Sequence, residues 1–87
     1  MITFKDLVFR YDNGVVYARF NFDNNYGISV VHGPNFYCDK DTYEVAVLRN
    51  NCLYYDTPIT DDVLGYQTPE DIDKIMTELQ SYKKNEY

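Results

Sequence analysis

The first two thirds of the chain alternate apolar and polar residues with a period of two, which is the pattern of half-buried β-strands. Asn13-Gly14 and Asn50-Asn51 interrupt the alternation, and such pairs favour tight hairpin turns. Connections this short join neighbouring antiparallel strands. The pattern therefore predicts a five-stranded antiparallel meander sheet, with strands at residues 7–11, 15–22, 27–32, 43–49 and 52–55.

Beyond residue 56 the alternation stops. Residues 60–65 run from a threonine and two aspartates to a glycine, which predicts one capped helical turn. Thr68-Pro69 then marks the start of a longer helix, with acidic residues in its first turn facing the positive end of the helix dipole. Its apolar residues recur at spacings of three, four and seven: Ile72, Ile75, Met76 and Leu79.

The apolar stripe of this helix needs a partner, and the largest apolar surface that the sequence offers is one face of the sheet. A chain of 87 residues has the length of one small domain. We therefore expect a single domain over residues 1–87 of the α+β class, with one C-terminal helix packed on one face of the five-stranded sheet.

Charge is concentrated between residues 56 and 73. The chain has 14 acidic and 8 basic residues, a net charge of −6. Six acids and no base fall in this stretch, so the other eight acids are matched in number by the eight bases. The six acids are Asp56, Asp61, Asp62, Glu70, Asp71 and Asp73. An acidic chain is not expected to bind nucleic acid directly, because that affinity comes from Lys and Arg.

The sequence carries no catalytic signature. It has one histidine, His32, and no nucleophile placed beside a base, so we expect no enzymatic activity. Cys38 and Cys52 are too few and too widely spaced for a zinc site and are expected to be free thiols. The calcium-loop spacing of aspartates is also missing. We therefore expect neither a metal nor a cofactor.

No apolar run approaches the roughly 20 residues that a membrane span requires. The first residues also lack the apolar segment of a signal peptide. We therefore expect a cytoplasmic protein without a membrane partner.

The acidic stretch has two interpretations. The first is structural: acids complement the helix dipole and form a solvated face. This accounts for Glu70 and Asp71, and it accounts less well for Asp56, Asp61 and Asp62, which lie outside the long helix. The functional interpretation is a surface that is steered toward a basic nucleic-acid-binding groove of another protein. The residues predicted to bind that partner are Asp56, Asp61, Asp62, Tyr66, Glu70, Asp71 and Asp73, with the tyrosine supplying an apolar contact.

Two other functions are open at this point. The loop at residues 33–41 and the aromatic-rich sheet could bind a nucleotide signal, with Arg10, Arg19 or Arg49 pairing with its phosphate. The protein could instead be a structural or regulatory protein that forms homo-oligomers through an edge of its sheet.

Three stretches of the chain carry a resemblance. Residues 55–76 (YDTPITDDVLGYQTPEDIDKIM), 22–31 (FDNNYGISVV) and 44–48 (EVAVL) resemble a group of short uncharacterised proteins of phages and prophages of Firmicutes. The resemblance implies a small accessory phage product that acts inside a bacterium. By analogy with other small acidic phage proteins, it implies an inhibitor of host defence, similar to anti-CRISPR proteins that mimic DNA.

Overall fold

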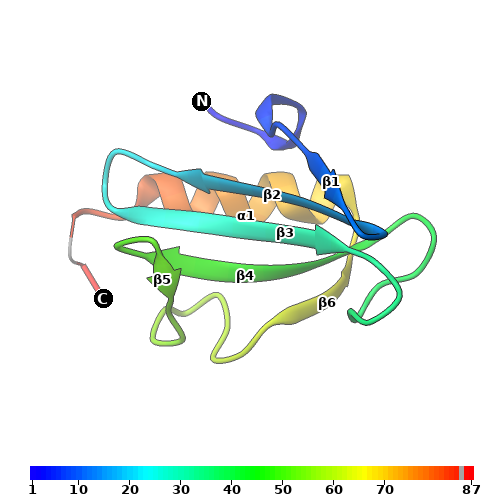
Figure 1. Ribbon diagram of the computed structural model, residues 1–87. Coiled ribbons are helices and arrows are strands. Elements are labelled where there is room, and N and C mark those ends of the chain that lie inside the picture. Colours follow the sequence, from blue (N-terminus) through cyan, green and yellow to red (C-terminus); the bar gives the residue numbers. More distant parts are fainter. Residues whose placement is uncertain (85) are drawn as a thin grey trace.

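The computed structural model describes residues 1–84 and 86–87, and it has one antiparallel sheet covered on one face by a C-terminal helix (Figure 1). The strands follow one another in the order β1-β2-β3-β4-β5, and β6 also pairs with β4. The predicted α+β class, the five-stranded meander and the single helix on one face are therefore confirmed. The elements are η1 (a 3-10 helix, Phe4–Asp6), β1 (Arg10–Asp12), β2 (Val15–Asn21), β3 (Tyr26–His32), β4 (Tyr43–Arg49), β5 (Cys52–Leu53), β6 (Leu64–Gln67) and α1 (Pro69–Ser81).

Asparagines make the hairpin turns. Asn13 and Gly14 join β1 to β2 with φ angles of 49° and 82°, and Asn50 and Asn51 join β4 to β5 with φ angles of 53° and 64°. Asn25 has a φ of 71° in the turn between β2 and β3. Asparagine and glycine tolerate this left-handed backbone better than other residues do, so the turns can close without strain.

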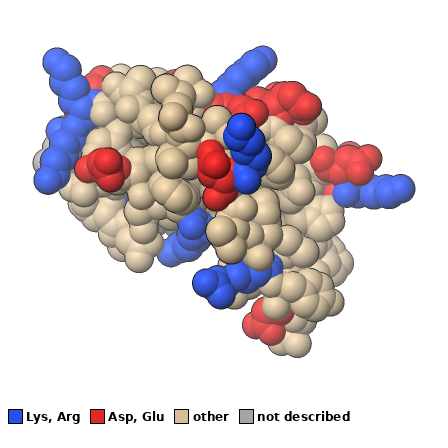
Figure 2. Space-filling model, turned by 90° about the horizontal axis from the view of Figure 1, so that it is seen from above, with Lys and Arg blue, Asp and Glu red and all other residues tan. Residues whose placement is uncertain are grey.

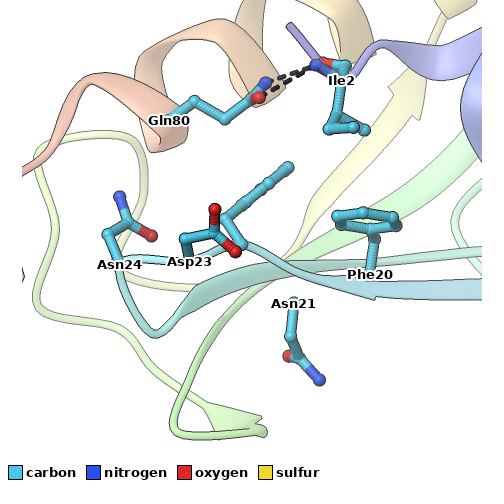
Figure 3. A pocket seen from close by; sticks show the side chains of 7 residues that line it. Ile2, Phe20, Asn21, Asp23, Asn24 and Gln80 are labelled. Atoms are coloured by element: carbon cyan, nitrogen blue, oxygen red, sulfur yellow. Dashed lines mark hydrogen bonds between the residues drawn. The ribbon is translucent and has the colours of Figure 1, made fainter.

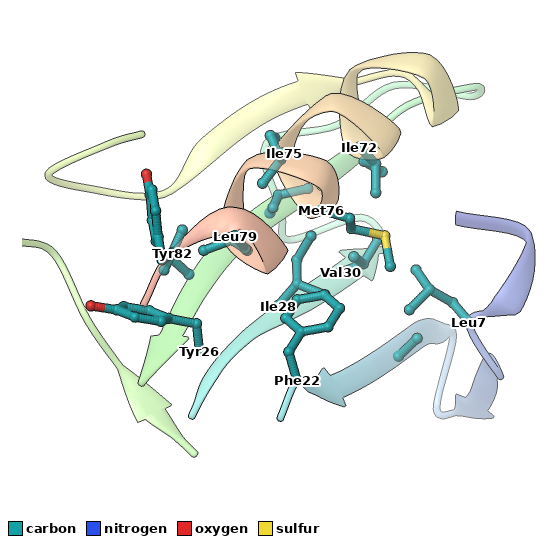
Figure 4. Close-up of a cluster of buried hydrophobic side chains, with 13 residues drawn as sticks. Leu7, Phe22, Tyr26, Ile28, Val30, Ile72, Ile75, Met76, Leu79 and Tyr82 are labelled. Atoms are coloured by element: carbon teal, nitrogen blue, oxygen red, sulfur yellow. The ribbon is translucent and has the colours of Figure 1, made fainter. Parts of the chain in front are cut away.

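The core lies between α1 and the sheet (Figure 4). All four residues of the predicted helical stripe, Ile72, Ile75, Met76 and Leu79, are buried. They pack against the sheet face that contains Ile28, Val30, Val45 and Val47. The register places Ile28 opposite Val47 and Val30 opposite Val45, so the apolar side chains of β3 and β4 share one face. Within the part of the chain that the structure describes, no helix has the length and apolar character that crossing a bilayer requires.

The N-terminal prediction was only partly right. The chain enters the sheet at Arg10 instead of residue 7, because the preceding residues dock on α1. The backbone N–H of Phe4 donates to the Asp73 carboxylate at 2.8 Å, and Leu7 is buried in the core. The last predicted strand is also shorter, since β5 ends at Leu53.

The predicted helical turn at residues 60–65 is wrong. The end of this stretch begins β6, in which Leu64 pairs with Val45 of β4. The Thr60 hydroxyl does not cap a helix: it accepts from the N–H of Asp62 at 3.0 Å and donates to its carbonyl at 2.9 Å. Gly65 does not end a helix either. A Cβ at Gly65 would lie 2.7 Å from the Cβ of Tyr37, so the glycine is needed for close packing.

Candidate interaction surface

The first three acids of the predicted site lie between β5 and β6. A bridge between Thr57 and Thr60 folds this segment into a tight turn. The Asp62 carboxylate accepts from the N–H of Val63 at 2.8 Å, so one of its oxygens holds its own chain. Asp56 and Asp61 are exposed, and neither side chain makes a hydrogen bond or an ion pair within the described residues. Two carboxylates of this segment are therefore free to meet a partner.

The other three acids lie in the first half of α1. Thr68 caps the helix and forms a reciprocal pair with Asp71: its N–H donates to the Asp71 carboxylate at 3.0 Å, and its hydroxyl accepts from the Asp71 N–H at 3.1 Å. The hydrogen bond from the Thr68 backbone, together with one from its side chain, lowers the pKa of Asp71. Glu70 is exposed and contacts no other polar group among the described residues.

Asp73 points in a different direction from Asp71. Its carboxylate holds the Phe4 N–H and so joins η1 to α1. At about 100° per residue, positions 71 and 73 are on opposite flanks of the helix. Asp71 and Asp73 thus complete local structure on two sides of α1.

The structure therefore separates the six acids instead of gathering them at one point. Asp56, Asp61 and Asp62 precede β6, and Glu70 follows it. Asp71 bonds the N-cap of α1, and Asp73 bonds the backbone of η1. We call Asp56, Asp61, Asp62 and Glu70, which precede and follow β6 in the sequence, together with Tyr66 in the strand itself, the acidic margin. No Lys or Arg occurs between residues 50 and 73, and no carboxylate of the margin is ion-paired within the described residues. On the side of η1, by contrast, acidic and basic side chains are interspersed (Figure 2).

Tyr66 has an unusual backbone. Its φ is 56°, and it is the only described residue with a positive φ that is neither asparagine nor glycine. Its N–H donates to the carbonyl of Tyr37 at 2.9 Å, which fixes this conformation, and its side chain is 59% exposed. The Tyr37 side chain is 64% exposed. The contact places two exposed tyrosines in neighbouring segments.

Sequence reasoning missed Tyr37. It is in the loop that joins β3 to β4, 29 residues before Tyr66 in the chain. Its amide N–H donates to the Glu44 carboxylate at 3.1 Å. The period-2 pattern gives no signal for a contact between this loop and β6, because the contact depends on how both segments meet β4.

The three arginines considered for phosphate binding do not converge. Arg10 is opposite Tyr17, and Arg19 is opposite Ser29, on the sheet face away from α1. Arg49 is on the helix side, with its guanidinium carbon 5.0 Å from the centre of the Tyr54 ring. It also donates to the Tyr54 hydroxyl and to the backbone carbonyl of Tyr87. This geometry does not favour a single phosphate site.

The histidine and cysteines have ordinary environments. Nδ1 of His32 donates to the carbonyl of Thr42 at 2.8 Å, which is the only role open to it opposite a carbonyl oxygen. Cys38 is half-buried, Cys52 is exposed, and both are free thiols, as predicted. Across residues 1–84 and 86–87, no three His, Cys, Asp or Glu side chains form a group that could hold a metal ion.

Comparisons of the chain with protein-family models, with curated proteins and with solved structures found no match.

Proposed function

We propose that this protein is a non-enzymatic accessory protein of phage type that acts in the bacterial cytoplasm. It binds a host nuclease or defence complex and inhibits it by occupying a basic nucleic-acid-binding groove. The observation that carries the proposal is the acidic margin: Asp56, Asp61 and Glu70 have unpaired carboxylates among the described residues, Tyr66 is exposed, and no base occurs between Arg49 and Lys74, which is one helical turn after Glu70.

The electrostatic part of the proposal concerns steering. Charges on a surface act over a Debye length of about 8 Å at physiological salt, and the excess of acids over bases in residues 56–73 gives the margin a net negative charge. Duplex DNA carries one charge per about 1.7 Å of its axis. The margin has only four carboxylates, and that of Asp62 bonds its own backbone. The margin therefore orients the protein on a basic groove and speeds association, and it does not copy the phosphate array.

The contact energy comes from the tyrosines. A left-handed backbone costs an L-residue roughly 1–2 kcal/mol, and the chain uses asparagine or glycine at each of its other positive-φ positions among the described residues. An exposed aromatic ring at the strained position is therefore unfavourable for the fold alone. Tyrosine is enriched among the residues that dominate the binding energy of protein interfaces, so a role in partner binding would explain a tyrosine at this strained position.

The surface is large enough for a specific complex. A standard interface buries about 800 Å² per partner, which is about one seventh of the 5444 Å² surface of this protein. The margin alone is narrow, so the interface would extend over neighbouring exposed tyrosines such as Tyr37 and Tyr55.

The test is affinity capture from bacterial lysate with two matched variants. Asp61→Lys/Glu70→Lys reverses two acids of the margin, and Asp12→Lys/Asp41→Lys reverses two exposed acids elsewhere. Each variant changes the net charge from −6 by +4 to −2. None of these four side chains makes a hydrogen bond in the described residues, so both variants should fold.

Wild type and the Asp12/Asp41 variant are expected to capture the same nucleic-acid-binding protein. The margin variant is expected to capture at least about tenfold less of it. Equal loss with both variants would mean that net charge alone matters. Unchanged capture by the margin variant, or a captured protein that binds no nucleic acid, would also overturn the proposal.

A further inference from the structure

A hollow of about 280 Å³ lies near the C-terminal end of α1 (Figure 3). The N-terminal segment, the turn between β2 and β3, and the last turn of the helix surround it. Phe20, Phe22 and Ile2 form its apolar lining, and Asp23, Asn24 and Gln80 are its polar residues. The side chain of Asn21 points away from the hollow, on the other side of β2 (Figure 3).

Both amide side chains at the hollow are fully used as donors. Nε2 of Gln80 donates to the carbonyls of Ile2 and Met76, at 2.6 Å and 3.0 Å, and its Oε1 accepts from the Ile2 N–H at 2.9 Å. Nδ2 of Asn24 donates to the carbonyls of Leu79 and Tyr82 at 2.8 Å and 2.9 Å. These bonds fix the walls and leave neither amide with a hydrogen for a ligand. An anion would find no side-chain donor here.

Asp23 is the unengaged polar group. Its carboxylate is exposed and makes no hydrogen bond or ion pair with the described residues. The hollow therefore offers one acceptor-only group, the Asp23 carboxylate, and such a group favours a cation.

The apolar lining specifies the rest of the ligand. The half-buried ring of Phe20 lies beside the buried ring of Phe22, with centroids 5.3 Å apart, and aromatic faces attract guanidinium and ammonium groups. Arginine and lysine bury their methylene stems along apolar surface while the charged head stays near water. The volume falls just below the 300–1,000 Å³ range of drug-sized ligand pockets, so it suits a single side chain.

We propose that this hollow is a binding site for an arginine side chain, with the stem on Phe20 and the guanidinium at Asp23. The planar guanidinium suits both the carboxylate and the aromatic surface. The site goes beyond the proposed function, because no residue of the acidic margin contributes to it. It can be tested without knowing the partner.

The experiment is an NMR titration of the ¹⁵N-labelled protein with N-acetyl-arginine amide, and with N-acetyl-citrulline amide as the uncharged isostere. Saturable shifts are expected at Phe20, Asp23 and Asn24 with a dissociation constant in the millimolar range.

Two variants make the result specific. Asp23→Asn should weaken arginine binding about two- to fivefold and leave citrulline binding unchanged, as expected for an exposed ion pair. Asp12→Asn removes the same charge from the end of β1 and should change neither. Equal binding of arginine and citrulline, equal effects of the two variants, or no saturable shift up to about 20 mM would overturn the proposal.

Discussion

Replacing Tyr66 with asparagine should separate the stability of the fold from its function. The φ of 56° imposes roughly 1–2 kcal/mol of strain on tyrosine, and asparagine relieves part of it. The ring is 59% exposed, so its removal costs about 0.6–1.2 kcal/mol, which is the buried fraction of the 1.5–3 kcal/mol for a fully buried large apolar side chain. The two terms nearly cancel, so Tyr66→Asn should leave the free energy of unfolding close to that of wild type.

Tyr11→Asn is the matched control. Tyr11 is 74% exposed in β1 and has no positive φ, so its replacement brings no relief of strain. Loss of its contacts and of strand propensity should destabilise the protein by about 1 kcal/mol. In urea unfolding, the free energy of unfolding of Tyr66→Asn should therefore be about 1 kcal/mol or more higher than that of Tyr11→Asn. This corresponds to a melting temperature about 4–8 °C higher.

The same substitution should impair binding. If Tyr66 is an interface anchor, its loss costs about 2 kcal/mol or more, roughly a thirtyfold drop in affinity for the captured partner. Calorimetric titration of that partner measures this directly. The reasoning fails if Tyr66→Asn destabilises the fold as much as Tyr11→Asn does, because the strain would then be absent. It also fails if partner affinity does not change.

Two more predictions concern the segments on either side of Tyr66. Gly65→Ala should lower the free energy of unfolding by about 1–3 kcal/mol in urea titrations, because the new Cβ would lie 2.7 Å from the Cβ of Tyr37, and a neutral result would refute that packing. Asp71→Asn should destabilise the protein at pH 7, because the Thr68 hydrogen bonds lower the pKa of Asp71 in the folded state. The contribution of Asp71 to the free energy of unfolding is fully present above the ordinary carboxyl pKa of about 3.9, and it is lost as the pH falls through the lower folded-state pKa. Unfolding curves of wild type and Asp71→Asn should thus converge below about pH 4, and a gap that persists at low pH would contradict this assignment.

Local signals were enough for most of the fold. The Asn-Gly and Asn-Asn pairs supply left-handed turns wherever they occur, and Thr68-Pro69 places the start of α1 at the observed residue. Strand β6 was missed because Thr60 and Gly65 carry the residue types of a helix cap and a helix stop. Thr60 instead bonds the backbone of Asp62, and the role of Gly65 depends on a loop far away in the sequence, where Tyr37 contacts the glycine.

The candidate site was harder to predict for the same reason. The sequence indicates how many acids the stretch contains, and it does not show which of them are engaged. The pair of Thr68 and Asp71 follows a recognisable capping spacing, whereas Asp73 holds an amide 69 residues away, at Phe4. Only the three-dimensional arrangement shows that Asp56, Asp61 and Glu70 are free within the described residues.

Competition by nucleic acid tests the central claim most directly. The captured partner is bound to immobilised wild-type protein, and duplex DNA or RNA is added at increasing concentration. If the margin occupies the nucleic-acid-binding groove, the partner should be released in proportion to the fraction of the partner that has bound nucleic acid. A stable complex that contains the partner, the nucleic acid and this protein together would contradict the account.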